Sequence, residues 1–239
     1  MIKVLASGSK GNCYLVQANE NEKLLIECGI AWRDIVCNLN FNLEGIQGCL
    51  ISHEHKDHCK DIKHILNNGI NVYTNKSVIE KNKITDLRRV NIINSLENLK
   101  IGNFKIKTFD CKHTNNDNSE CENLGFIIHH EELGTIAFAT DTYYLKYKLD
   151  NINHLFIECN YCEKDIQDLE PYRARIFKSH MSLETLKEAL KTWNLSTIED
   201  ITLIHLSESN ADENYMKEEI EKLTGVPVYI AKKGLILDV

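Results

Sequence analysis

The chain has 239 residues, 43% of them hydrophobic and 26% charged, and a formal net charge of −7. These values are typical of a globular protein with a sizeable core. No apolar run approaches the roughly 20 residues that a membrane helix needs, so we expect no membrane span. The negative charge excludes a protein that coats duplex DNA over its whole surface, because such binding needs cationic side chains to replace the phosphate counterions.

Short β-branched and apolar runs predict strands along the whole chain. In chain order they are Lys3–Ala6, Cys13–Gln17, Lys23–Glu27, Gly48–Ile51, Asn71–Thr74, Phe104–Phe109, Leu124–His129, Thr135–Ala139, His154–Glu158, Ile201–Ile204 and Val228–Ala231. Helical spacing of apolar residues predicts helices between them. They are Cys59–Asn67, Lys76–Asn82, Leu183–Thr192 and Asp212–Leu223.

Two boundary signals accompany the predicted helices. Ser182 is a candidate N-cap, and Gly225 followed by Pro227 is a candidate helix stop. The chain has only two prolines and no Gly/Ser linker, so we interpret residues 1–239 as one domain. The alternation of predicted strands and helices along the chain fits two sheets with helices on their outer faces, and it equally allows one doubly wound sheet.

The cysteines and the N-terminal residues indicate the cellular compartment in which we expect the protein. Nine cysteines are present, and Met1 leads directly into the strand-like Ile2–Leu5 with no signal-like segment. An odd number of cysteines without a signal favours reduced thiols. We therefore expect a cytoplasmic protein.

The most informative run follows the apolar Leu50–Ile51. It places His53, His55, Asp57 and His58 within six positions. Imidazole and carboxylate groups are ligands that suit zinc, manganese or iron. Four such ligands on one loop can serve two metal ions at once, so this run predicts a metal site.

The run resembles the His-x-His-x-Asp-His motif of the metallo-β-lactamase-fold hydrolases. That resemblance implies an α/β protein with a four-layer αββα fold, in which two mixed sheets are sandwiched between helices. It also implies further ligands after later strands, for which His113, Asp141 and His205 are the candidates. Members of this group cleave β-lactams, thioesters and phosphodiesters.

The resemblance implies two divalent ions, Zn or Mn, and assigns the ligands to them. His53, His55 and His113 would hold the first ion, while Asp57, His58 and His205 would hold the second. Asp141 would bridge both ions, and Asp57 would also orient the attacking hydroxide. Secreted zinc β-lactamases lack this bridging aspartate, so the candidate Asp141 argues against that branch.

Longer motifs resemble the YycJ (WalJ) family of phosphodiesterases across nearly the whole chain. Val4–Cys13 is similar to its opening Leu-Ala-Ser-Gly-Ser-x-Gly-Asn, and Leu25–Gly29 is similar to its next turn, where Asp is more usual than Glu27. Lys178–Ser182 resembles its Gly-His-Leu-Ser motif, and Leu203–Asn210 resembles its His-Leu-Ser-x-x-Asn motif. Ribonuclease Z carries a motif related to the third of these.

By this resemblance His180 is a catalytic histidine that stabilises the transition-state charge or protonates the leaving oxygen. Arg175 and Arg173 are candidates for phosphate contacts. Ser9 and Asn12 belong to a tight turn beside the site and are further candidates for substrate contacts. Two departures lie near the expected substrate side. Glu158–Cys162 replaces the usual Glu-Ser-Asn-His-Asp, and Ser179 replaces a glycine.

These features predict a hydrolase that cleaves P–O bonds of nucleic acid, with a DNA exonuclease as the first hypothesis. The alternative is a cyclic nucleotide phosphodiesterase similar to phage anti-Pycsar proteins, which the acidic charge favours. A glyoxalase II-like thioesterase and a non-catalytic metal-binding scaffold are further alternatives. Similar phosphodiesterases are commonly dimers, so a homodimer is a further expectation.

Overall fold

The computed structural model describes residues 1–115, 117–166, 176–208 and 211–239. In these residues two seven-stranded mixed sheets face each other. In spatial order the first contains β16 (Ile236–Leu237), β1 (Ile2–Ala6), β2 (Cys13–Asn19), β3 (Glu22–Ile26), β4 (Ile46–Leu50), β5 (Val72–Thr74) and β6 (Val90–Ile92). The second contains β15 (Val228–Ile230), β14 (Asp200–Ile204), β13 (His154–Glu158), β12 (Gly134–Ala139), β11 (Leu124–His130), β8 (Phe104–Asp110) and β7 (Asn98–Ile101).

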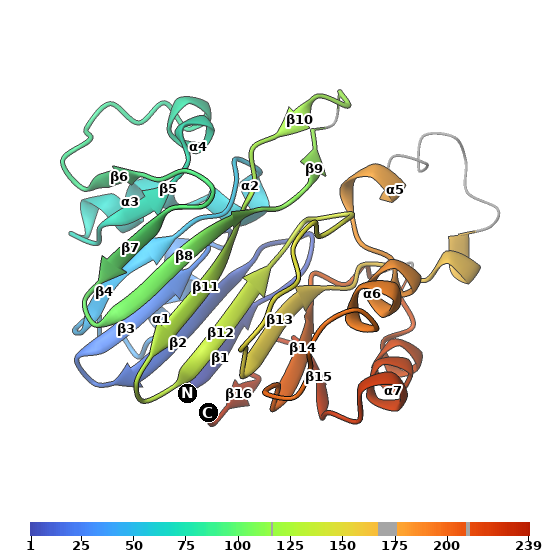
Figure 1. The fold of residues 1–239 in the computed structure, drawn as a ribbon. Helices are drawn as coiled ribbons and strands as arrows, with labels where there is room; N and C mark the ends of the chain where they lie inside the picture. Colours follow the sequence, from blue (N-terminus) through green and yellow to red (C-terminus); the bar gives the residue numbers. More distant parts are fainter. Residues whose placement is uncertain (116, 167–175, 209–210) are drawn as a thin grey trace.

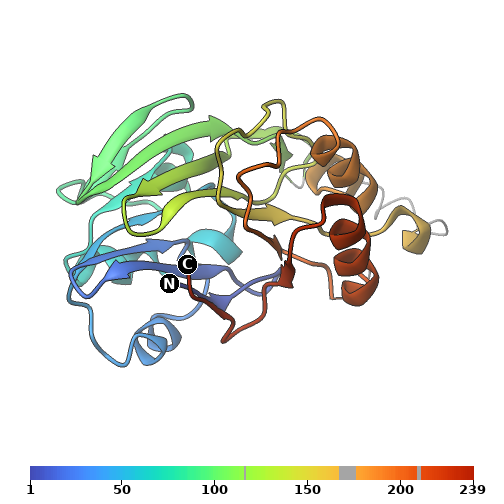
Figure 2. The ribbon, with the colours of Figure 1, turned by 60° about the horizontal axis from the view of Figure 1, so that its bottom comes forward.

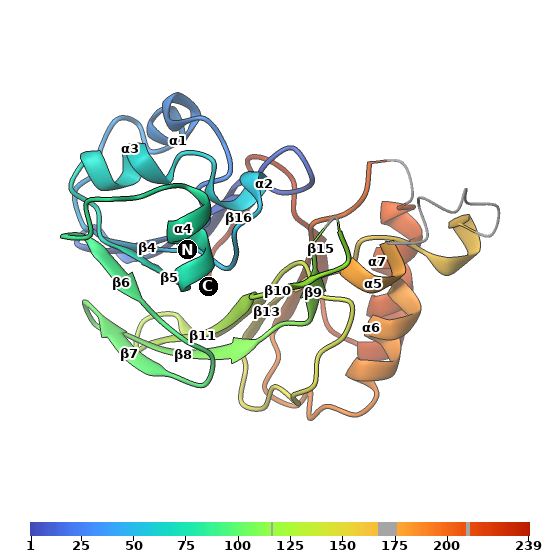
Figure 3. The same ribbon diagram turned by 90° about the horizontal axis from the view of Figure 1, so that it is seen from above.

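Helices cover the outer faces of both sheets (Figures 1 and 3). The helices beside the first sheet are α1 (Trp32–Asn38), α2 (Lys56–Cys59), α3 (Ile62–Asn67) and α4 (Lys76–Lys81). Those beside the second are α5 (Ile176–Ser179), α6 (Leu183–Leu190) and α7 (Glu213–Thr224), with a 3-10 turn η1 (Glu163–Ile166). This arrangement confirms the predicted four-layer fold and excludes the single doubly wound sheet. None of the helices in the described part of the chain is long and apolar enough to span a membrane.

Period-2 alternation explains why the layers form. In β12, Ile136 and Phe138 enter the core between the sheets, whereas Ala137 and Ala139 face α6 and α7 on the outside. Alternate residues of a strand point to opposite faces, so a strand that is apolar on both faces is buried on both. Three buried clusters result, one between the sheets and one under each helical layer.

The helix boundaries differ from expectation around the metal loop. The predicted helix Cys59–Asn67 is two helices, α2 and α3, and α2 begins at Lys56 within the run that we predicted to be a loop. The predicted caps are confirmed: the Ser182 side chain accepts a hydrogen bond from Thr185 N, and Gly225 ends α7 at a φ of 69°. Figure 2 shows α6 and α7 lying against the outer face of the second sheet.

Aromatic rings hold the two sheets together. Tyr14 of the first sheet makes an edge contact with Phe138 of the second at 5.1 Å between ring centroids, and a longer contact with Phe156 at 6.4 Å. All three rings are buried. Such pairs contribute beyond their apolar area, because the edge of one ring meets the face of another.

We expect Phe138→Ala to lower the free energy of unfolding by about 3–5 kcal/mol, because it removes a ring from the inter-sheet core and leaves a cavity. Denaturant unfolding followed by circular dichroism measures this. The control is Phe41→Ala, whose side chain is 75% exposed and which we expect to change the free energy by less than about 0.5 kcal/mol. Equal effects of the two substitutions would contradict this role of the ring contact.

Candidate metal centre

The carboxyl ends of parallel strands deliver most of the site. Glu27 follows β3, and the run that begins at His53 follows β4. In the second sheet Asp141 follows β12, Glu158 ends β13, and His205 follows β14. Because β3 and β4 are parallel, as are β12 to β14, these residues gather at one edge, between the two sheets.

A small two-stranded sheet adds the remaining histidine. It consists of β9 (His113–Thr114) and β10 (Glu120–Cys121), and it projects above the edge of the main sheets in Figure 1. His113 is buried, so this small sheet places a ligand candidate in the centre rather than in solvent.

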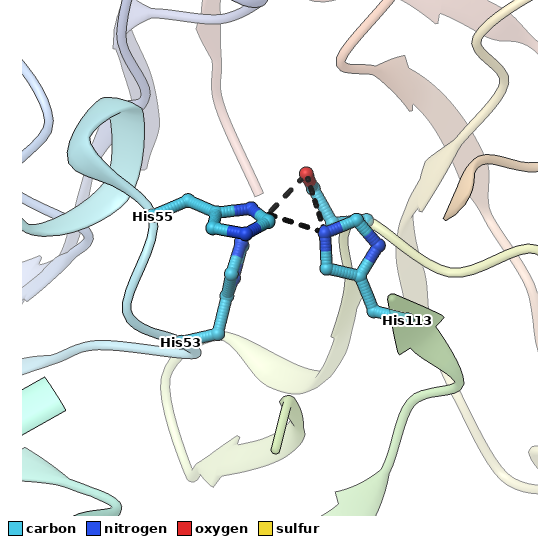
Figure 4. A group of neighbouring side chains, drawn as sticks. His53, His55 and His113 are labelled. Carbon is cyan, nitrogen blue, oxygen red and sulfur yellow. Dashed lines mark hydrogen bonds and ion pairs between the residues drawn. The ribbon is translucent and has the colours of Figure 1, made fainter. Parts of the chain in front are cut away.

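The first group of possible ligands contains His53, His55, His113 and Asp141. One ligand atom of each lies within 4.8 Å of the others. Figure 4 shows the three histidine rings turned toward one another. Nε2 of His113 lies 3.1 Å from Nδ1 of His55, and Asp141 Oδ2 lies 3.8 Å from Nε2 of His53.

The opposite ring nitrogen of each of these histidines is held by the protein. Nδ1 of His53 lies 2.9 Å from Ser52 Oγ, and Nε2 of His55 lies 3.0 Å from Asn115 Oδ1. Nδ1 of His113 lies 2.7 Å from a backbone carbonyl oxygen, that of residue 179. Such outer contacts fix the ring orientation and leave the inner nitrogen for an ion.

The second group contains Asp57, His58, His205 and again Asp141. Asp57 Oδ2 lies 3.3 Å from Nε2 of His58 and 3.3 Å from Nε2 of His205. Asp141 Oδ1 lies 3.2 Å from Nε2 of His58. Asp141 presents one oxygen to each group, which is the arrangement of a carboxylate between two ions.

Two further carboxylates lie behind the histidines. Glu27 Oε1 is 3.6 Å from Nδ1 of His58 and accepts a hydrogen bond from Ser52 N. Glu158 Oε1 is 3.0 Å from Nδ1 of His205. Both glutamates are fully buried. They orient the ligand rings from the side that faces away from the centre.

Burial and neighbouring charges separate the histidines into two classes. Burial lowers the pKa of His53 and lowers the pKa of His113 to about 4, so both rings are neutral at pH 7. Burial also opposes protonation of His58 and His205, but the carboxylates around them, Asp141 foremost, outweigh it. They raise the pKa of His58 and raise the pKa of His205 to about 10.

The central carboxylates stay ionised. Burial alone would raise the pKa values of Asp57 and Asp141. For Asp57 the hydrogen bonds from His205 and His58, and for Asp141 the charges of these rings, hold both pKa values below the usual range. A buried carboxylate stays ionised only beside compensating positive charge. The arrangement of these carboxylates therefore favours bound cations.

Three site residues adopt left-handed backbone conformations. The φ angles are 66° for Glu27, 47° for Asp141 and 55° for His205. Side chains other than glycine, asparagine and aspartate rarely adopt this region, and each such residue costs of order 1–3 kcal/mol. Each lies one or two residues after the end of a strand, where the turn aims its side chain into the centre.

The turn of residues 7–12 between β1 and β2, which contains Gly8 and Gly11 and is called the glycine-rich turn here, supports the run that supplies the ligands. Asn12 N donates to Asp57 O at 2.7 Å, and Asn12 Nδ2 lies 3.1 Å from Nε2 of His58. A Cβ on Gly29 would lie 1.6 Å from Asp57 O, so only glycine fits there. Asn12 is fully buried and positions the ligands, whereas Ser9 beside it is exposed.

His180 lies next to the ligand groups. Its Nδ1 is 2.7 Å from Glu158 Oε1, and its ring stacks on His205 at 5.3 Å between centroids. The side chain is 20% exposed, so the ring borders both the centre and solvent. With Asp141, Glu158 and His205 it also forms a third possible ligand group.

The remaining residues singled out in the sequence are either outside the described part of the chain or away from the ligand groups. Arg173 and Arg175 fall outside the described residues, as does Asn210 of the last motif. His64 is mostly exposed, lies 2.9 Å from Asp61 and stacks on Trp32. The histidines that matched no motif are away from the ligand groups, and of these His154 pairs with Asp200 at 2.6 Å in the sheet.

Sequence reasoning missed the residues that orient the ligands. Ser52, Asn115 and Glu158 are ordinary polar residues, and nothing in their spacing identifies their partners. Glu27 was visible only as a departure from a family aspartate. An acidic residue at the end of each predicted parallel strand is the signal that could have found both glutamates.

The centre fits divalent metal ions. Nε2 of His53 is buried, faces Asp141 and has no hydrogen-bond partner in the described structure. An unpartnered buried nitrogen costs about 1–3 kcal/mol unless a ligand meets it. The donor set of imidazoles and carboxylates suits zinc or manganese.

We expect the purified protein to bind two divalent ions per chain, and Asp141→Ala to lower the bound metal to about one ion or less, because the carboxylate shared by both groups is lost. Elemental analysis after desalting measures the content. His64→Ala removes an exposed histidine and should retain the wild-type content. Full occupancy in Asp141→Ala would contradict the shared role.

Metal binding at pH 7 should release about two protons per chain, because His58 and His205 carry protons before they become ligands and ligation needs the neutral ring. Calorimetry in buffers of different ionisation enthalpy measures the release. Above pH 10 the release should fall as His205 loses its proton in the metal-free protein. A binding enthalpy that is the same in all buffers would contradict this assignment of charge.

Curated relatives share the sequence at low identity. Exodeoxyribonuclease YycJ of Bacillus anthracis is 23% identical over 202 residues, which cover 80% of this chain and 67% of that protein. Exodeoxyribonuclease WalJ of Streptococcus pneumoniae is 24% identical over 229 residues, which cover 87% of this chain and 81% of that protein. Both alignments extend over most of the chain.

Solved structures share the fold. The metallo-beta-lactamase fold protein YhfI from Bacillus subtilis superposes with a TM-score of 0.75 at 21% identity and covers 99% of this chain and 98% of its own. Zn(2+)-bound PqqB from Methylobacterium extorquens has a TM-score of 0.74 at 14% identity and covers 100% of this chain and 99% of its own.

The profile of the beta-lactamase superfamily domain matches residues 22–206, a span that begins with β3 and ends just after His205. It therefore includes every ligand candidate described above. On this match, together with the shared fold, the chain belongs to the beta-lactamase superfamily and is a hydrolase with the metallo-β-lactamase fold, related at low identity to the YycJ and WalJ exodeoxyribonucleases.

Proposed function

We propose that the protein is a dinuclear-metal phosphodiesterase that hydrolyses P–O bonds of nucleic acid and acts as a DNA exonuclease. The observation that carries the proposal is the pairing of His180 with Glu158 beside two ligand groups that share Asp141. The His180–Glu158 pair suits proton transfer to a leaving oxygen. The two ligand groups suit two metal ions that would bind the oxygens of a phosphodiester. The exodeoxyribonuclease activity named for both curated relatives supports the choice of substrate.

The proposed ligands are His53, His55 and His113 for one ion, Asp57, His58 and His205 for the other, and Asp141 for both. Two divalent ions held there would supply Lewis acidity, which activates water and neutralises the phosphate oxygens. The histidine-rich donor set supports zinc, as does the zinc named for the fold relative PqqB, while the two carboxylates also suit manganese.

Asp57 is the carboxylate best placed to meet the nucleophile. Its side chain is 24% exposed, whereas that of Asp141 is 3% exposed. The hydrogen bonds from His58 and His205 keep the pKa of Asp57 below its usual range, so it is a charged acceptor at neutral pH. We assign it the orientation of the attacking water and acceptance of its proton.

His180 is the proposed proton donor. Glu158 holds its Nδ1, which leaves Nε2 as the nitrogen that can meet a substrate oxygen. Burial opposes ionisation of Glu158, but the charge and the hydrogen bond of His180 outweigh it and lower the pKa of Glu158, so Glu158 is an ionised acceptor for Nδ1 of His180. Transfer of the Nε2 proton to the departing sugar oxygen completes P–O cleavage and leaves a terminal phosphate.

The thiols support a reducing compartment for this activity. Eight of the nine cysteines are buried. Cys159 and Cys162 are among the buried thiols. Reduced buried thiols are typical of cytosolic proteins, so we propose a cytoplasmic nuclease.

We expect His180→Ala to lower kcat on end-labelled DNA by roughly 10²- to 10⁴-fold, because the general acid is lost. The metal content should stay at the wild-type value, which separates this role from that of a ligand. Asp57→Ala is the control that should lose both activity and metal. The measurement is release of mononucleotides, together with elemental analysis of each variant.

The same assay includes RNA, 3′,5′-cyclic mononucleotides and a chromogenic thioester. If the protein opens the ring of cyclic nucleotides and leaves DNA undegraded, it is a signal-degrading phosphodiesterase and the nuclease proposal is wrong. Hydrolysis of the thioester alone would indicate a glyoxalase II-like enzyme. Full metal occupancy without turnover of any substrate would leave a metal-binding scaffold.

A further inference from the structure

A polar cavity lies outside the metal centre. It has a volume of about 750 Å³ and is bounded by α3, the turn that follows it, and the segment 83–89 between α4 and β6. Four cationic side chains line it. They are Lys63, Lys83, Arg88 and Arg89.

The charge of this cavity opposes that of the whole chain. Asp86 is the one acidic residue in its lining, so the formal charge there is 4 − 1 = +3, against −7 for the protein. Asp86 pairs with Arg88 at 2.5 Å. Within the described part of the chain, Lys63, Lys83 and Arg89 make no ion pair, so their charges are available to a ligand.

Arg89 is an exposed residue at the cavity wall. Its guanidinium lies near Gly69, where an added Cβ would be 3.8 Å from Cζ and from Nη2. Nη1 donates a long hydrogen bond of 3.5 Å to Asn71 Oδ1. A guanidinium has five N–H donors, and this neutral contact uses one of them. The remaining donors can bind a phosphate group in a bidentate manner.

The lining indicates which part of a nucleic acid is bound. It contains no aromatic side chain on which a base could stack, and its apolar members are Leu66 and Ile84. Cations without stacking surfaces bind phosphates and do not read bases. The segment 83–89 and α2, which carries Asp57 and His58, lie at the same end of the molecule in Figure 1.

We propose that this basic cavity binds the phosphate backbone of the DNA substrate at a distance from the scissile bond. The inference rests on the proposed function and adds a second contact region to it. It explains how a chain of net charge −7 retains a polyanion: four of its 28 Lys and Arg side chains meet in one hollow whose own formal charge is positive. Binding there is independent of base sequence.

The test is the double substitution Lys83→Gln with Arg89→Gln in the metal-loaded enzyme. The quantity measured is kcat/KM for a long DNA duplex at several salt concentrations. Loss of two phosphate contacts should flatten the slope of log kcat/KM against log salt by about 1.8 and lower kcat/KM roughly 10- to 30-fold at about 0.15 M salt. Hydrolysis of bis(4-nitrophenyl) phosphate, which is too small to reach both regions, should be unchanged.

The matched control is Lys217→Gln with Lys222→Gln on α7, which changes the net charge equally but removes lysines paired with glutamates. It should retain the wild-type salt slope. If DNA is degraded and the two double variants behave alike, the basic cavity is not a contact and this inference falls alone. If the wild-type enzyme hydrolyses the small diester but no DNA, the nuclease proposal falls with it.

Discussion

Buried negative charge is the constraint around which this protein is organised. Glu27, Asp141 and Glu158 are each buried at the end of a strand, where an isolated carboxylate is strongly disfavoured. The histidines around them are the available compensation, and two of these hold protons against the effect of burial. The parallel strands, the small β9–β10 sheet and the glycine-rich turn all bring these opposite charges within reach of one another.

The sequence predicts the centre better than it predicts its surroundings. His53, His55, Asp57 and His58 lie in one run, so their proximity follows from covalent connection alone. Asp141 and His205 follow strongly apolar strands, which indicates their edge of the sheet. The contact of Asn115 with His55 spans 60 residues and depends on how the small sheet folds over the centre, which no local pattern encodes.

The same reasoning explains the missed elements. The clearest predicted strand is β8, in which apolar and polar residues alternate. The three-residue strands β5 and β15 were found from their β-branched and aromatic residues, whereas β9 and α2, with two and four residues, are too short to show a period. The four-layer arrangement came from the family resemblance, since alternation of strands and helices was compatible with one sheet or two.

The left-handed conformations of Glu27, Asp141 and His205 have a consequence for evolution. If conformation alone were selected, glycine or asparagine would replace at least the glutamate and the histidine, because both fit this region at lower cost. Their presence in this chain indicates that the chemistry of the side chain outweighs the gain in stability. In related chains that have abandoned hydrolysis, these turns should therefore be among the first positions to drift toward glycine, which makes them markers of whether the reaction is still under selection.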